Sequence, residues 1–91
     1  MQDIKSVLEK FLRKTGMDKP VLQNRALVVW NEVVGDTVAG RAQPEEVKHG
    51  VLVVKVDTPV WRNELSLRKS EIVKALNRAI GESVIKDIRL I

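Results

Sequence analysis

Residues 49–59, HGVLVVKVDTP, decide the fold. Val51 to Val56 is a run rich in β-branched residues between turn residues, which predicts a strand. Alternate residues from Leu52 to Val56 share one face of that strand, which we expect to be buried. Asp57-Thr58-Pro59 predicts the start of a helix, because a capping side chain precedes a proline that the first helical turn tolerates. His49-Gly50 predicts the turn before the strand.

A weaker strand precedes this turn, between Ala42 and Lys48, so that the two strands form a hairpin. Pro44 cannot donate a ladder hydrogen bond, so this strand should lie at a sheet edge or carry a bulge. After Pro59 a helix is expected to run to about Ile80, with a bend near Ser66 as one alternative. The apolar stripe of this helix is Trp61, Leu65, Ile72, Leu76 and Ile80.

Two helices are predicted before the hairpin. The first runs from about Asp3 to Thr15 as an amphipathic helix, and Gly16 is its expected end. The second begins near Pro20 and ends at Gly35, after which a short turn leads to Gly40. The apolar stripe of the second helix is Leu22, Ala26, Val29, Trp30 and Val33.

The order of elements is therefore helix, helix, strand, strand, helix, strand, with a last strand from Val84 to Ile91. This order predicts an α+β fold in which helices cover one face of a three-stranded sheet. Its 91 residues are enough for one domain, residues 1–91, with a single core and no deep substrate cavity.

The composition excludes several classes of site. There is no cysteine, so disulfides, thiol catalysis and nearly all structural zinc sites are excluded. The one histidine, His49, lies in a predicted turn without partners at a suggestive spacing. We expect no enzymatic activity, no metal, no cofactor and no small-molecule substrate. No apolar run approaches the length of a membrane span and no signal peptide is evident, so a cytoplasmic protein is expected.

The formal net charge is +4, and it is unevenly distributed. Residues 59–91 carry seven basic and four acidic groups, whereas residues 21–58 carry four basic and five acidic groups. Such a surface favours polyanions. The basic candidates for phosphate contact lie on the last helix and are Arg62, Arg68, Lys69, Lys74 and Arg78. Arg68, Lys74 and Arg78 are expected on one side of that helix, with Arg62 and Lys69 at the other edge of its apolar stripe. A solvated helix face, partly neutralised by glutamates, explains the same pattern.

Trp61 and Leu67 are candidates for partner binding. Trp61 occupies the first turn of the last helix, where one ring edge could remain at the surface and either stack on a base or anchor a protein partner. Leu67 points away from the apolar stripe of its helix. A buried position is the alternative for Trp61, and for Trp30 it is the preferred interpretation.

The order of these residues resembles the DciA family of bacterial proteins. The resemblance rests on Trp30-x-x-Val33-Val34-Gly35-x-x-Val38-Ala39, Ala42-x-Pro44, Gly50-x-Leu52-x-Val54-x-Val56, Trp61-x-x-Glu64-Leu65, Ile72, Leu76-Asn77, Gly81 and Ile88-Arg89. It implies a KH-like domain and a replication accessory role. Family members bind the DnaB-type replicative helicase, promote its loading onto single-stranded DNA without hydrolysing ATP, and bind nucleic acid through basic surface.

Two departures from the expected pattern matter. The Gly-x-x-Gly loop of nucleic-acid-binding KH domains is missing, so any contact should run through Lys and Arg side chains. The long extension that many family members carry is also missing from these 91 residues. Three hypotheses therefore stand: a helicase-binding module with weak affinity for single-stranded DNA, a protein-interaction domain without a nucleic-acid role, and a small RNA-binding protein. The second predicts an exposed apolar patch that includes Phe11, Leu67 or Trp61.

Overall fold

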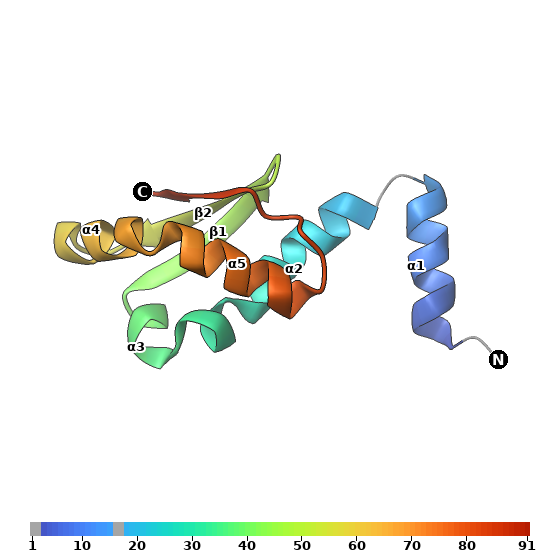
Figure 1. Cartoon of the computed structure of the whole chain (residues 1–91), viewed down its shortest axis with the longest axis horizontal. Helices are drawn as coiled ribbons and strands as arrows, with labels where there is room; N and C mark the ends of the chain where they lie inside the picture. The colour runs from blue at the N-terminus through green and yellow to red at the C-terminus, as the bar shows by residue number, and fades with distance from the viewer. Residues whose placement is uncertain (1–2, 16–17) are drawn as a thin grey trace.

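The computed structural model describes residues 3–15 and 18–91. Its elements are α1 (Ile4–Thr15), α2 (Asp18–Val34), α3 (Asp36–Ala39), β1 (Ala42–Lys48), β2 (Val51–Val56), α4 (Pro59–Leu67), α5 (Lys69–Ile80) and β3 (Asp87–Leu90). Figure 1 shows the helices that follow α1 on one side of the sheet, with α1 set apart at one end of the molecule. The predicted α+β class and the KH-like order of elements are confirmed.

The sheet has the order β1-β2-β3, with β1 antiparallel and β3 parallel to β2. Leu52 is paired with Val47 on one side and with Ile88 on the other. Leu52, Val54 and Val56 are buried beneath the helices, while Lys55 is exposed on the opposite face. The alternation predicted for this strand is therefore confirmed, and the helices cover only one face.

In the hairpin of β1 and β2, the strand that contains Pro44 lies at the sheet edge and His49-Gly50 forms the turn, as predicted. β1 is an edge strand, and its register shifts between Pro44 and Glu46, which marks a bulge. In the turn, His49 and Gly50 both have positive φ, 53° and 81°, as a type I′ turn requires. A Cβ atom on Gly50 would also lie 3.1 Å from the Lys86 Cγ, so glycine is favoured here by space as well as by conformation.

Trp30 connects α2 to the sheet. Its side chain is 1% exposed, and its indole Nε1–H donates a 3.0 Å hydrogen bond to the carbonyl oxygen of Ala42 in β1. A buried indole normally needs such an acceptor, because an unpaired N–H in a dry core is costly. The largest other fully buried side chains are Leu52, Leu65, Leu76, Ile88 and Val54. The preferred interpretation of Trp30 as a core residue is confirmed.

The long helix expected from Pro59 to Ile80 is instead two helices. α4 ends at Leu67 and α5 begins at Lys69, and the intervening Arg68 has φ −105° and ψ 5°. The break allows α4 to pack on β2 while α5 packs on α2 and β3. Thr58 caps α4, since its Oγ1 accepts a 3.2 Å hydrogen bond from the Trp61 amide. The bend foreseen near Ser66 thus lies two residues later, and only Arg68 separates the helices.

The last strand is shorter than the predicted range from Val84 to Ile91. Val84 and Ile85 are buried but lie outside β3, because the side chain of Asn77 binds their backbone. The Asn77 Oδ1 accepts hydrogen bonds from both amides, at 3.1 and 2.8 Å, and its Nδ2 donates to the Ile85 carbonyl at 2.9 Å. One side chain therefore holds the segment between α5 and β3 in place.

We expect Asn77→Ala to lower the free energy of unfolding by about 2 kcal/mol, because it leaves the amide and the carbonyl of Ile85 without these partners, while the Val84 amide keeps its 3.0 Å hydrogen bond to the Glu82 carbonyl. Urea denaturation followed by circular dichroism measures the change. Asn63→Ala on the exposed side of α4 is the matched control. Equal stability of the two variants would contradict the role given to Asn77.

The amphipathic helix α1 is formed, but its apolar stripe is not buried. Asp3 caps the helix, since its Oδ1 accepts a 2.8 Å hydrogen bond from the Ser6 amide. This hydrogen bond lowers the pKa of the Asp3 carboxyl below its ordinary value. Ile4, Val7 and Leu8 are 87%, 54% and 53% exposed. The end predicted for this helix at Gly16 lies outside the described residues.

Candidate nucleic-acid interface

A groove runs between the α4–α5 helices and β3. One wall carries Arg62, Ser66 and Lys69, and the other carries Asp87 and Arg89. The groove has a volume of about 390 Å³. The parallel pairing of β3 with β2 positions Arg89, which lies opposite Val53 in the register. Strand alternation then places Arg89 away from the buried side chain of Ile88.

The groove continues along α5. Lys69 and Asp87 also line a second hollow, which reaches Lys74 and Lys86. Lys74 also lines a third hollow beside Arg78, at the C-terminal end of the helix. Neighbouring hollows share lining residues, and we call the three together the basic groove. Its charged residues are Arg62, Lys69, Lys74, Arg78, Lys86 and Arg89, opposed by Glu82 and Asp87. A concave surface with this excess of cations concentrates anions.

Arg62 is a partly buried cation of the basic groove that is hydrogen-bonded to the sheet. Its Nη2 donates a 3.4 Å hydrogen bond to the Val56 carbonyl, so its guanidinium is held against the end of β2. Its Nε is buried and has no hydrogen-bond partner among the described residues. A buried donor without an acceptor is unfavourable, so this position of Arg62 costs some stability.

Arg68 lies apart from the other predicted phosphate ligands. Its Nη2 donates to the Glu64 Oε1 at 2.6 Å, one helical turn away, and both side chains are about half exposed. Its side chain lines a different pocket, between α2–α3 and α4–α5. The structure therefore brings Arg62, Lys69, Lys74 and Arg78 along one groove and separates Arg68 from Lys74 and Arg78.

The two candidates for partner binding differ in exposure. Trp61 is half-buried and packs against the core, whereas Leu67 is 77% exposed. Val60, seven residues before Leu67 and thus on the same side of α4, is also 77% exposed. We call Val60 and Leu67 the α4 patch. The protein-interaction hypothesis predicted an exposed apolar patch that includes Phe11, Leu67 or Trp61. In the structure Leu67 and Phe11 are exposed, and Trp61 is partly exposed.

Sequence reasoning missed Lys86 and Arg89 in the groove and Val60 on α4. The alternation along the strand predicts that the side chain of Arg89 is exposed. Its position across the groove from Arg62 depends on the parallel register of β3, which the sequence does not reveal. Lys86 lies just before β3, and its amide donates a 2.7 Å hydrogen bond to the Gly50 carbonyl. Val60 could have been found from its i, i+7 spacing to Leu67.

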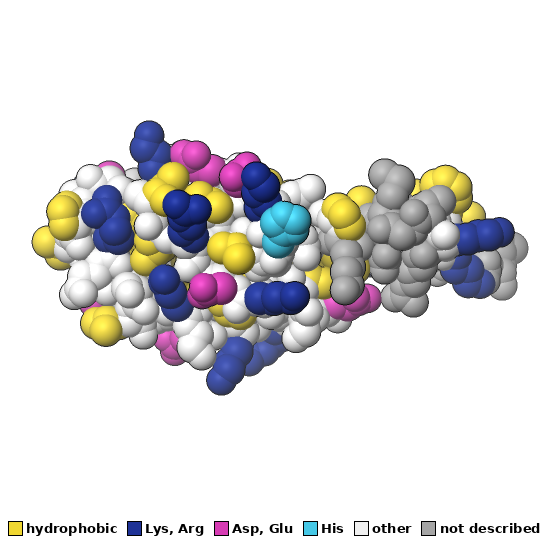
Figure 2. Space-filling view, turned by 90° about the horizontal axis from the view of Figure 1, so that it is seen from above, with side chains coloured by type: hydrophobic (Ala, Val, Ile, Leu, Met, Phe, Trp, Pro, Cys, Tyr) yellow, Lys and Arg dark blue, Asp and Glu magenta, His cyan; other side chains and the backbone are white. Residues whose placement is uncertain are grey.

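The uncovered face of the sheet is a second charged surface. Figure 2 shows Lys and Arg side chains on this side of the molecule, interspersed with acidic and hydrophobic side chains. Its strands carry Lys48, Lys55 and Glu46, and Arg89 and Asp87, which also line the basic groove, lie at its β3 edge. Because the two signs alternate here, this face attracts an extended polyanion less than the basic groove does.

Within residues 3–15 and 18–91, no three His, Cys, Asp or Glu side chains gather in a way that could hold a metal ion. No described helix combines the length and the apolar character needed to cross a bilayer.

Curated bacterial proteins resemble this chain over most of its length. A UPF0232 protein of Rhodococcus jostii is 28% identical over 78 residues, which cover 86% of this chain and 42% of that protein. A UPF0232 protein of Mycobacterium ulcerans is 25% identical over 89 residues, which cover 98% of this chain and 48% of that protein. The chain thus spans less than half the length of these relatives.

A family model described as "Dna[CI] antecedent, DciA" matches residues 3–90. The match includes every helix and strand of the structure, from α1 to β3. The resemblance found in the order of glycines, tryptophans and apolar residues is thereby confirmed, and the chain belongs to the DciA family.

Proposed function

We propose that this chain is a non-enzymatic replication accessory protein that binds the DnaB-type replicative helicase and promotes its loading onto single-stranded DNA. In this proposal the basic groove holds the DNA weakly. The observation that carries the DNA-binding part is the basic groove itself, where six cations face two carboxylates. Membership of the DciA family supports a replication role associated with the helicase in general terms.

The composition of the basic groove favours contacts to phosphates over contacts to bases. Among the described residues that line it, none is aromatic. Stacking on aromatic side chains normally supplies about 1–3 kcal/mol per base in single-strand binding. Without it, affinity depends on Lys and Arg contacts to the backbone, so binding should be weak, tolerant of sequence and sensitive to salt.

The α4 patch is the surface that we assign to the helicase. Val60 and Leu67 are both 77% exposed, and large exposed aliphatic side chains on one helix face are typical of protein contact sites. Trp61 lies between them in sequence and is half-buried, so its free edge can extend the contact. The patch and the basic groove use different residues, and one chain could therefore hold helicase and DNA together.

Capture of the purified replicative helicase from the same organism tests this assignment. Val60→Asp with Leu67→Asp should abolish helicase capture and leave the affinity for oligothymidylate unchanged. Lys69→Ala with Arg89→Ala should weaken binding of oligothymidylate and leave helicase capture unchanged. Each double variant is thus the control for the other. In a loading assay on single-stranded DNA circles, the Val60–Leu67 variant should fail. Helicase capture that survives both aspartates would remove the α4 patch from the proposal.

A protein-interaction role without nucleic acid is the second candidate, and the exposure of the α4 patch favours it. It predicts helicase capture that DNA does not influence, together with no binding of oligothymidylate even at low salt. An RNA-binding role differs only in its ligand. Competition between RNA and DNA oligonucleotides of matched sequence distinguishes it, because preference for RNA requires recognition of the 2′-hydroxyl.

A further inference from the structure

Besides the α4 patch, two further apolar surfaces are uncovered within the described residues, and the first is on α1. Ile4, Val7 and Leu8 follow helical spacing and are each more than half exposed. A surface helix normally buries such a stripe against a neighbouring element. Figure 1 shows α1 standing away from the remainder of the fold. Its apolar face is thus available for a partner.

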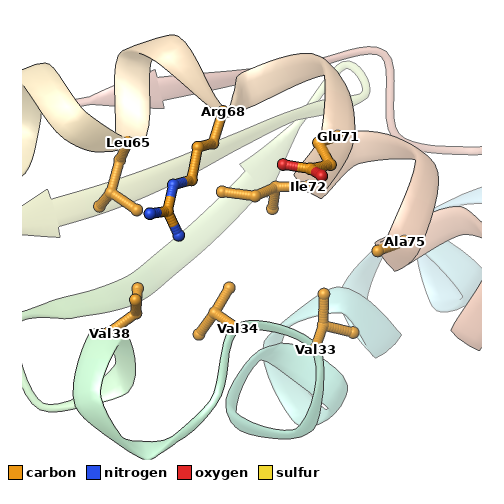
Figure 3. Close-up of a pocket in the computed structure, with 8 residues that line it drawn as sticks. All are labelled: Val33, Val34, Val38, Leu65, Arg68, Glu71, Ile72 and Ala75. Atoms are coloured by element: carbon orange, nitrogen blue, oxygen red, sulfur yellow. The ribbon is translucent and has the colours of Figure 1, made fainter.

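The second surface is a pocket between two pairs of helices, which we call the valine pocket. Its lining residues are Val33, Val34 and Val38 from α2–α3, and Leu65, Arg68, Glu71, Ile72 and Ala75 from α4–α5. Figure 3 shows the three valines facing Leu65, Ile72 and Ala75 across the opening. Its volume of about 250 Å³ is below the roughly 300–1,000 Å³ of small-molecule sites. It therefore suits one or two apolar side chains of a partner helix.

The charges around these two surfaces are complementary. α1 exposes Lys5, Lys10 and Lys14 beside its apolar stripe. In the α2–α3 wall of the valine pocket, residues 26–40 include the exposed Glu32 and Asp36 and no basic residue. On the other wall Glu71 lines the pocket, and Arg68 is already paired with Glu64. A basic apolar helix therefore fits this pocket better than an acidic one does.

The position of α1 determines which pocket it can fill. The molecule is 50 Å long, and α1 lies at the end opposite α3 and α4 (Figure 1). As placed in the structure, α1 cannot enter the valine pocket of its own chain. A second α1 is itself basic and offers no carboxylates comparable to Glu32, Asp36 and Glu71 of the valine pocket among its described side chains. We propose that the valine pocket accepts α1 of a second copy of this chain, through the stripe of Ile4, Val7 and Leu8.

Sedimentation equilibrium between micromolar and millimolar protein tests this contact. We expect reversible association that weakens as salt increases, because the lysine–carboxylate contacts are exposed. Val7→Asp with Leu8→Asp should weaken association by about tenfold or more, as should Ala75→Arg in the pocket. A mixture of the two variants should associate again, since each supplies the surface that the other lacks. Val28→Asp, on an exposed site of α2 outside both surfaces, is the control and should have no effect.

Charge exchange separates docking from damage to the fold. Glu71→Lys should weaken association, and adding Lys10→Glu should restore it, whereas a misfolded variant would not recover. A chain that stays monomeric to millimolar concentration overturns the proposal, as does association that Ala75→Arg leaves unchanged. Binding of monomeric chain to phosphatidylglycerol vesicles, lost with Val7→Asp and Leu8→Asp, would overturn it in favour of a lipid surface for α1.

Discussion

Lys69→Ala combined with Arg89→Ala is expected to weaken binding of single-stranded DNA by about tenfold at low salt. The two residues lie on opposite walls of the basic groove. Each phosphate contact to a single strand contributes about 0.7 to the slope of log affinity against log salt. Removing two contacts should therefore reduce that slope by about 1.4. Titration of a fluorescent oligothymidylate between 25 and 200 mM salt, concentrations chosen for roughly equal logarithmic steps, measures both quantities.

The matched control removes the same charge elsewhere. Arg41 and Arg68 are exposed and each binds one carboxylate, Asp57 at 3.2 Å and Glu64 at 2.6 Å. Arg41→Ala with Arg68→Ala should change affinity far less, because neither residue lies in the basic groove. If the two double variants lose equal affinity, net charge alone governs binding and the basic groove has no special role.

Trp30→Ala should lower the free energy of unfolding by about 3–5 kcal/mol, the range found for buried aromatic residues. The substitution leaves a cavity between α2 and the sheet and removes the hydrogen-bond donor of the Ala42 carbonyl. The total free energy of unfolding of a small protein is only about 5–15 kcal/mol, so the variant should be close to unfolding. The shift of the urea midpoint, followed by far-ultraviolet circular dichroism, measures the loss.

Two further variants locate the cause of that loss. Trp30→Phe keeps a large apolar ring but removes the hydrogen bond, and it should be intermediate in stability. Trp61→Ala should lower the free energy of unfolding less than Trp30→Ala does, because Trp61 is already partly exposed. A Trp30→Ala variant as stable as the unmodified chain would show that α2 is not held by this side chain.

Local patterns were sufficient to predict most of the fold. The β-branched run from Val51 to Val56, the Thr58-Pro59 helix start and the glycines after α2 and α5 all act through neighbouring residues. The break at Arg68 was not located, because Arg68 is an ordinary helix former and the break depends on where α4 and α5 pack. The last strand begins later than predicted, after a segment that is bound by the side chain of Asn77, eight residues before Ile85.

The candidate site was less predictable than the fold. Four of the five predicted basic residues line the basic groove, but Arg62 lies on α4 and the other three on α5, so helical spacing alone does not bring them together. Lys86 and Arg89 join them only through the pairing of β3 with β2, a contact between distant parts of the chain. The exposure of the α1 stripe could not be foreseen either, since apolar residues at helical spacing indicate a buried face as readily as a binding face.

The central claim is that single-stranded DNA lies in the basic groove. The most direct test is a nuclear magnetic resonance titration of the isotope-labelled chain with oligothymidylate, in which backbone amide shifts report the contacted residues. We expect the largest changes at Arg62, Lys69, Lys74, Lys86 and Arg89, with little change at the bulge of β1 or on α3. Changes centred on α1 or on Glu46, Lys48 and Lys55 of the uncovered sheet face, or no changes at low salt, would contradict the account.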